Sequence, residues 1–425
     1  MNVISPGVKG GLDTCINWEP LSISAGTRIS LKAPGFIFRV FAYKKELPPE
    51  LIYTSTMPPE GCMMIYDPDA SCLNWQDREF TVHCDSYIRL SARSSYGSVL
   101  DADLYLDDIF EIVPGPSTEG PEGTGEGPSF MAEELEDTVS KVLKCRREKD
   151  FVFIMPADTH YAFGGTWKDT EACIRALAGR IGPDMIVHLG DITDGMMPES
   201  LDSMCVKRTD RGLKAAGIPV RYCVGNHDLV SIYSDDIKGY AERKTDLITG
   251  GRGAYYYEDL PEKNIRCIYL SAYEPSEEDP YGFSVEEISW LERTLKEMPE
   301  GFKALVFTHV SPLLNMVQKS DRVRNASKVM EVLKASYKDR NILGVFAGHS
   351  HVDSLDNAGF PVIRTGCAKL EDHAAGSRPL HTGVFTRKAG TASQELLDIA
   401  VVHTDTADMD IIRFGKGEDR HAEAE

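Results

Sequence analysis

The sequence has no apolar run long enough to cross a bilayer, and residues 1–9 lack the basic start and apolar stretch of a secretory signal. We therefore expect a cytoplasmic protein without a membrane span, with association to a phage virion or a cell surface as the alternative. The ten cysteines contain no C-x-x-C pair. Neither a thiolate zinc site nor a dense disulfide framework is indicated.

An excess of positive charge is also lacking. The chain carries 46 Lys and Arg against 66 Asp and Glu, a formal net charge of −20. Because this charge repels polyanions, nucleic acid is not an expected partner, and small partners fit better. A chain of 425 residues with 42% hydrophobic content is long enough for two or three domains around a large core.

Residues 1–113 are predicted to form a small all-β sandwich domain. Apolar and polar residues alternate with period two, most clearly in 27–32, 36–41 and 87–92. The aromatic side chains of this segment have two interpretations: core packing, which is favoured in so small a domain, and an exposed platform for carbohydrate or a cell surface. They are Trp18, Phe36, Phe38, Phe41, Tyr43, Trp75, Tyr87 and Tyr96.

A compositional break follows this segment. Residues 114–129 are Gly, Pro, Ser, Thr and Glu, which cannot bury enough apolar surface to order themselves, so we predict a linker there. A connecting helix is expected over 130–149, since its first turn is acidic and its last turn basic. The second domain should span 150–416, with a polar tail at 417–425.

Apolar runs alternate with helical patterns in this second domain, which predicts an α/β core. Expected helices cover 168–178 and 284–296, and a closing hairpin pairs 397–402 with 409–415. Strands are expected at 151–154, 185–189, 218–224, 266–270, 303–307 and 344–347.

Polar side chains gather where five of these strands end, at the edge where open α/β sheets carry their chemistry. Any one such residue has an ordinary interpretation as a turn or a satisfied core residue, but their joint occurrence does not. His188, inside an apolar strand, is expected to be a core residue. The strand-end stretches are Asp158-x-His160, Gly190-Asp191, Gly225-Asn226-His227-Asp228, His309 and Gly348-His349-x-His351.

This set of motifs resembles the calcineurin-like metallophosphoesterase superfamily. All five blocks occur in the family's order between about residues 150 and 414, and the closing hairpin resembles that of bacterial and phage members. The resemblance implies a four-layer αββα sandwich for residues 150–416.

The resemblance also implies a ligand set for two divalent metal ions. Asp158, His160, Asp191 and His351 would hold the first ion, and Asp191, Asn226, His309 and His349 the second. Carboxylate, amide oxygen and imidazole suit Mn, Fe or Zn. Asp191 would bridge the pair because a carboxylate offers two anionic oxygens.

Two such ions can share a hydroxide, lower its pKa and direct it in line at phosphorus. By resemblance, His227 would act as general acid toward the leaving alkoxide. Asp228 would orient His227, with a helix N-cap as the alternative. Asp194 is expected to be a turn or supporting residue. The predicted activity is therefore hydrolysis of a small phosphomonoester or phosphodiester.

Two other functions compete with this interpretation. Nuclease action conflicts with the charge and the absence of a basic stripe. A phage-tail or cell-surface binding protein with a vestigial esterase domain would be expected to have lost ligands, and none is missing.

Substrate selection must come from loops near the strand ends. Candidates for contact with a base or sugar are Tyr161, Trp167, the turn 250–253 with Tyr255–Tyr257, and the segment 367–378 with His373. Arg252 and Arg364 are candidates for clamping a phosphate, although a surface position is favoured for Arg252. None of these residues is assigned to the site.

Overall fold

The computed structural model describes residues 15–17, 21–23, 27–32, 36–44, 80–81, 86–94, 110–113, 127–161, 166–195, 199–230, 234, 236–275, 277–314, 323–370 and 387–424. The chain divides into two compact units, one built on residues 1–124 and the other on residues 125–162 and 166–425. Among the described residues, no helix is long and apolar enough to cross a membrane.

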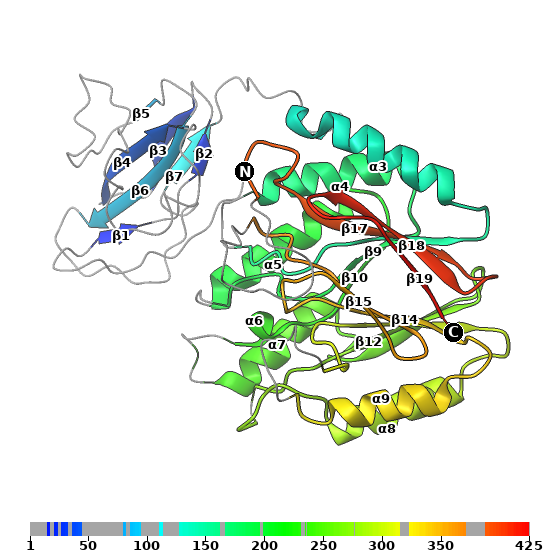
Figure 1. The fold of residues 1–425 in the computed structure, drawn as a ribbon. Coiled ribbons are helices and arrows are strands. Elements are labelled where there is room, and N and C mark those ends of the chain that lie inside the picture. The colour runs from blue at the N-terminus through cyan, green and yellow to red at the C-terminus, as the bar shows by residue number, and fades with distance from the viewer. Residues whose placement is uncertain are drawn as a thin grey trace. The chain divides into compact units, whose positions relative to one another are not determined.

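The described strands of the first unit are all antiparallel, in agreement with the predicted all-β class (Figure 1). In one sheet, β6 (Ser86–Ser94) pairs with β1 (Cys15–Asn17), β2 (Leu21–Ile23) and β4 (Phe36–Lys44). In the other, β3 (Arg28–Leu31) pairs with β5 (Phe80–Thr81) and β7 (Phe110–Val113). The side chains of the eight aromatic candidates lie outside the described part of the structure, so sandwich packing and a carbohydrate platform stay predictions.

The second unit contains two six-stranded sheets. The first has the order β10-β9-β8-β17-β18-β19, in which β8, β9 and β10 are parallel and the C-terminal strands are antiparallel. Its strands are β8 (Phe151–Met155), β9 (Met185–His188), β10 (Val220–Tyr222), β17 (Leu396–His403), β18 (Asp408–Gly415) and β19 (Arg420–Glu423).

The second sheet has the order β11-β12-β13-β14-β16-β15, with four parallel central strands and an antiparallel strand at each edge. Its strands are β11 (Tyr256–Leu260), β12 (Ile265–Leu270), β13 (Lys303–Thr308), β14 (Ile342–Ala347), β15 (Ser354–Asn357) and β16 (Pro361–Arg364).

The two sheets face each other across an apolar core. Phe153 of β8 lies edge-on to Phe307 of β13 and to Phe346 of β14, with ring centroids 5.3 Å apart in both pairs. All three side chains are fully buried, and apolar residues of both sheets join the same cluster. Close packing between the sheets therefore fixes how their edges align.

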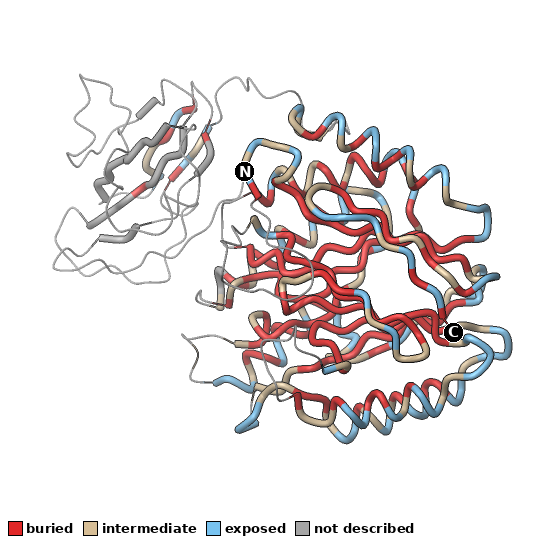
Figure 2. Tube along the Cα trace, viewed as in Figure 1, coloured by how far each residue is buried: buried red, intermediate tan, exposed pale blue. Residues whose placement is uncertain are grey.

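Helices cover the outer faces and complete the αββα layers (Figures 1 and 2). α3 (Ala132–Cys145), which follows the short 3₁₀ turn η1 (Ser129–Met131), packs on β17 and β18 and beside α4 (Trp167–Ile181). α8 (Val285–Lys296) and α9 (Ala326–Ser336) bury their apolar faces against the second sheet. The remaining helices are α5 (Glu199–Lys214), α6 (Asn226–Leu229) and α7 (Ile237–Thr249). The four-layer fold agrees with the expectation from the sequence.

Candidate metal centre

The seven residues expected to bind metal lie directly after five parallel strands. Asp158 and His160 follow β8, Asp191 follows β9, Asn226 opens α6 after β10, His309 follows β13, and His349 and His351 follow β14. All are buried or nearly so, with side-chain exposures of at most 8% for the Asp and His residues. Two facing sheets thus bring together residues up to 193 positions apart in the sequence, from 158 to 351.

The backbone turns sharply to point these side chains inward. Asp158, His160, Asp191, His349 and His351 have φ angles of 53°, 41°, 52°, 65° and 56°. L-residues rarely adopt this left-handed region, and each instance costs about 1–3 kcal/mol. Five such residues in one place are the signature of backbone strain held for function.

A small residue is needed where two of the turns meet. A Cβ on Gly225 would lie 2.2 Å from Oδ1 of Asp191. A Cβ on Gly190, whose φ is 96°, would lie 2.8 Å from Nδ1 of His309. Glycine at both positions lets the strand ends approach closely, with Asp191 packed against Gly225 and His309 packed against Gly190.

One group of ligand atoms comprises Asp158, His160 and His351, which lie within 4.8 Å of one another. Nε2 of His351 is 3.3 Å from Oδ1 of Asp158 and 3.2 Å from Nε2 of His160. Burial would raise the pKa of Asp158, but the charge of His351, its hydrogen bond and the charge of His309 together lower that pKa. Cys367 and the same Asp158 carboxylate raise the pKa of His351 well above its ordinary value against the effect of burial. The group therefore requires positive charge beside Asp158.

The second group comprises Asp191, His309 and His349, again within 4.8 Å of one another. Nε2 of His309 lies 3.2 Å from Oδ2 of Asp191 and 3.2 Å from Oδ1 of Asn226. Its Nδ1 donates to the carbonyl of Leu189 at 2.8 Å, which leaves Nε2 facing the site.

The charges of this group are strongly coupled. Burial opposes a raised pKa at His309, but Asp191 overcomes it and raises that pKa to about 9. Burial and the neighbouring His309 charge lower the pKa of His349 to about 4. The pKa of Asp191 falls well below its ordinary range, because His309 and His160 outweigh burial. The site thus compensates its buried carboxylates with protons on imidazoles.

Asp191 lies between the two groups. Its Oδ2 is 3.7 Å from Nε2 of His160 on one side and 3.2 Å from Nε2 of His309 on the other. Its Oδ1 accepts the backbone N–H of His227 at 2.8 Å. The donor set of carboxylates, imidazoles and one amide oxygen, with no thiolate among them, fits a pair of borderline divalent ions. Such ions would replace the protons as the compensating charge.

His227 points its ring at the same centre. Its Nδ1 donates to the backbone carbonyl of Asp194 at 2.7 Å, and its ring lies edge-on to His160 with centroids 4.7 Å apart. His227, His160 and Asp191 offer ligand atoms within 4.8 Å of one another. His227 is thus held within reach of both ligand groups.

Asp194 supports two histidines at once. Besides its carbonyl contact with His227, its Oδ1 lies 3.2 Å from Nδ1 of His160 and 3.5 Å from Nζ of Lys369. Burial would raise its pKa, but the contact with His160 and the charge of Lys369 lower it. Lys369 lies in the candidate segment 367–378 but was not singled out from the sequence, because this irregular segment has no periodic or motif signal.

The Asp228 carboxylate is occupied by backbone groups. It accepts N–H groups of Ile192 at 2.9 Å, Thr193 at 3.3 Å and Gly225 at 2.9 Å. These bonds join the turn after β9 to the start of α6, as a capping residue does. Asp228 therefore holds together the loops that carry Asp191 and His227. The His227 ring itself is held by the backbone carbonyl of Asp194.

The expected core histidine is buried. His188 is fully buried, and burial lowers its pKa to about 3, so its ring is neutral. Its Nδ1 accepts the backbone N–H of Gly190 at 3.1 Å. It supports the turn that leads to Asp191.

Most of the loop candidates for substrate contact have structural partners. Tyr161 and Trp167 are buried and pack against each other. Arg364 is fully buried and pairs with Asp356 at 2.6 Å, so the suggestion that it clamps a phosphate is wrong. His373 lies outside the described residues.

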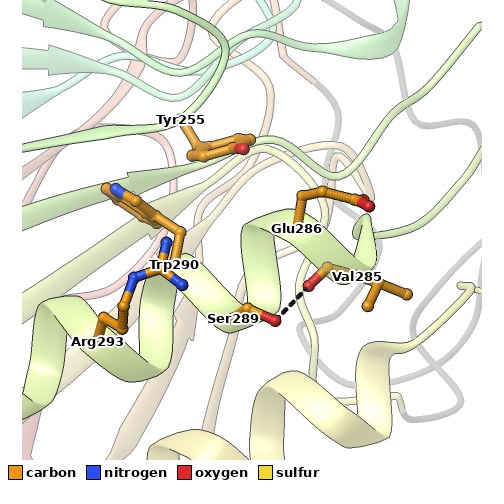
Figure 3. A pocket seen from close by; sticks show the side chains of 6 residues that line it. All are labelled: Tyr255, Val285, Glu286, Ser289, Trp290 and Arg293. Carbon is orange, nitrogen blue, oxygen red and sulfur yellow. Dashed lines mark hydrogen bonds between the residues drawn. The ribbon is translucent and has the colours of Figure 1, made fainter.

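The turn 250–253 and its tyrosines lie at a separate surface. Arg252 is exposed, as favoured, and lies over the ring of Tyr256. Tyr255 contributes to a pocket of about 310 Å³, in which it faces Trp290 (Figure 3). The pocket lining is Tyr255, Val285, Glu286, Ser289, Trp290 and Arg293, none of which belongs to the Asp and His groups.

Asp191 lies between two buried groups of carboxylate and imidazole side chains, an arrangement that fits a pair of divalent ions of the kind that hydrolyses phosphate esters. Residues 152–353 match the family model of calcineurin-like phosphoesterases, and this part of the chain belongs to that family. A search of curated proteins found no match.

Solved structures were also compared. A dimetal phosphatase from Danio rerio is 19% identical, with 65% of this chain and 99% of that chain covered and a TM-score of 0.45. A purple acid phosphatase from yellow lupin (Lupinus luteus) seeds is 11% identical, with 98% and 74% covered and a TM-score of 0.44. Phosphopantetheinyl hydrolase from Mycobacterium tuberculosis is 11% identical, with 52% and 91% covered and a TM-score of 0.33. The family assignment rests on the family model.

Proposed function

We propose that this protein hydrolyses a small phosphate ester, mono- or diester, at a pair of divalent ions of the Mn, Fe or Zn kind. The observation that carries the proposal is Asp191, whose Oδ2 lies within 3.7 Å of imidazoles of both ligand groups. When bound, the ions would activate water for attack at phosphorus and neutralise the charge that develops there.

The proposed ligands follow the two groups. Asp158, His160, Asp191 and His351 hold one ion, and Asp191, Asn226, His309 and His349 hold the other. This division is supported by the distances within each group and by Leu189, whose carbonyl fixes the Nδ1 proton of His309 and so leaves Nε2 to bind.

His227 is the proposed general acid. Because its Nδ1 donates to the Asp194 carbonyl, the ring can pass only an Nε2 proton to a leaving oxygen. Asp228 serves this step indirectly by holding the loops of Asp191 and His227.

The all-β unit is proposed to be an accessory domain, joined to the phosphoesterase domain by the linker 114–129 and the helix that follows it. Its proposed partner is carbohydrate or a cell surface, as the aromatic content of its sequence suggests.

The test combines metal analysis with turnover of two generic substrates, 4-nitrophenyl phosphate and bis(4-nitrophenyl) phosphate. We expect two divalent ions per chain and metal-dependent hydrolysis of at least one ester. A metal-loaded protein that is inert toward both esters would instead favour a binding protein with a vestigial esterase domain. The ester that is cleaved distinguishes monoesterase from diesterase.

A further inference from the structure

Two tyrosines from the loop after β12 lie beside the second ligand group. The Tyr281 ring is 5.4 Å from the His349 ring, and Tyr273 lies edge-on to Tyr281 with centroids 5.0 Å apart and planes at 76°. Both side chains are only partly buried. Among the described residues, neither hydroxyl has a hydrogen-bond partner.

The loop that carries these rings is held in place. Tyr273 and Tyr281 pair across it as an antiparallel bridge, flanked by hydrogen bonds from Gly282 to Ala272 at 2.9 Å and from Glu274 to Pro280 at 2.8 Å. The two rings are therefore fixed on neighbouring arms of a hairpin-like turn, and binding a ligand against them needs little ordering of the loop.

The base of the loop is anchored to the start of α9. Phe283 donates to the carbonyl of Arg324 at 3.0 Å, and Arg324 forms an ion pair with Glu274 at 2.5 Å. Gly282 packs so tightly there that a Cβ would lie 2.2 Å from Cβ of Arg324. A position held this closely is poorly suited to a mobile lid.

Both phenols interact with the charge of Asp191. Burial, the neighbouring Tyr273 and the charge of Asp191 raise the pKa of Tyr281 to about 12. Burial and the same Asp191 charge raise the pKa of Tyr273.

The tip of the loop is acidic. Glu277, Glu278 and Asp279 are exposed there, and the only described basic partner of the loop, Arg324, is paired with Glu274. A second anionic group on a substrate would be repelled at this end of the site. This combination of aromatic faces and carboxylates therefore favours an uncharged ring.

We propose that Tyr273 and Tyr281 form a binding wall for an uncharged aromatic ring carried by the alcohol part of the phosphate ester. This inference rests on the proposed function, because the wall matters only if the phosphate lies at the adjacent ligand groups. Offset or edge-on packing against two tyrosine rings favours an aromatic group over a saturated ring of similar size by about five-fold.

The experiment compares benzyl phosphate with cyclohexylmethyl phosphate, or their methyl diesters if the protein cleaves diesters. The two alcohols differ in the ring and hardly in reactivity. In parallel, calorimetry measures binding of benzylphosphonate and cyclohexylmethylphosphonate, which cannot be hydrolysed, to the metal-loaded protein. We expect the wild-type protein to prefer the aromatic member about five-fold in kcat/KM and in affinity.

The variants Tyr281→Leu and Tyr273→Leu should bring this ratio close to one, whereas Tyr281→Phe should keep it because the ring remains. Tyr257→Leu is the matched control, since Tyr257 is 43% exposed and packs on Trp290 instead. Thermal unfolding shows whether each variant is folded, and the wild-type ratio is informative without any variant.

A wild-type ratio near one overturns the proposal, as does a Tyr281→Leu protein that loses both ligands equally and so reveals only a packing role. Failure of the proposed function has a different signature. A protein that binds benzylphosphonate selectively but hydrolyses neither ester supports the aromatic wall and contradicts only the hydrolytic activity.

Discussion

The backbone N–H of His227 donates a 2.8 Å hydrogen bond to Oδ1 of Asp191. The proposed proton donor is therefore attached, through its own backbone, to the carboxylate that lies between the two ligand groups. Any change at Asp191 should disturb both charge compensation and the placement of the general acid.

The first prediction concerns Asp191 itself. Asp191→Ala should lose both ions, because neither group keeps a complete set of anionic ligands without it. Metal per chain, measured by plasma mass spectrometry after desalting, should fall from two towards zero. Asp246→Ala, at an exposed position on α7, is the control and should retain the metal. One ion retained at full occupancy would contradict the assignment of Asp191 to both sites.

The second prediction separates chemistry from metal binding at His227. His227→Ala should leave the metal content near normal, since the residue is not a proposed ligand. Turnover of esters with poor leaving groups, such as alkyl phosphates, should fall by about 10²–10⁴-fold, whereas 4-nitrophenyl esters, which need no protonation, should lose far less.

His421→Ala, at a half-exposed position on β19, is the matched control and should behave as the wild type. Equal losses for activated and unactivated esters in His227→Ala would rule out the general-acid role. Loss of one metal ion from His227→Ala would instead indicate that His227 is a metal ligand.

The third prediction tests the support given by Asp194. Its carboxylate contacts Nδ1 of His160 at 3.2 Å, whereas its backbone carbonyl, which holds His227, survives mutation. Asp194→Ala should therefore lower the affinity for the first ion by about 10–100-fold and leave the affinity for the second ion nearly unchanged. Calorimetric titration of metal-free protein with Zn²⁺ resolves the two steps.

Lys369→Ala is the control for Asp194→Ala, since it removes the other charged partner of Asp194 and leaves the contact with His160. An equal loss of affinity for both ions in Asp194→Ala would show that Asp194 acts on the whole loop and not through His160.

The fourth prediction concerns Glu287, which is buried in the first turn of α8 and accepts the N–H of Ser271 at 2.7 Å. Burial raises its pKa well above the ordinary value of 4.5. The native carboxyl thus keeps a proton that the unfolded chain has lost, so its contribution to the free energy of unfolding falls as pH rises above about 4.5.

Glu287→Gln cannot titrate and keeps the acceptor oxygen. Its free energy of unfolding relative to the wild type should therefore rise by about 1 kcal/mol for each pH unit above 5, until the native pKa is reached. Urea unfolding at pH 5, 6 and 7 measures this slope. Glu286→Gln, next to it but exposed, should show none.

The fold and the convergence of the expected ligand residues were predictable because both depend on local patterns. The apolar run 185–189 corresponds to β9 (Met185–His188), and Asp191 lies three residues beyond the end of this strand. Parallel strands align their carboxyl ends, so polar residues at several strand ends had to meet. The same rule brought His309 and His349 together from two strands of one sheet.

Residues that depend on long-range packing were not predictable in the same way. Arg364 carries a charge that suggests solvent, yet it is buried because Asp356 on the neighbouring strand compensates it. Tyr273 and Tyr281 lie in an irregular loop whose path is fixed by Arg324, and no periodicity signals their position beside His349. The role of Asp194 likewise depends on how two loops approach each other.

The strained backbone at five ligand positions has a consequence for how the protein matures. The turns at Asp158 and Asp191 belong to one sheet, and those at His349 and His351 to the other. Neither half can form the complete site before the sheets dock, so tight metal uptake should be a late step of folding. Appearance of the metal-bound signal during refolding would then report closure of the whole domain.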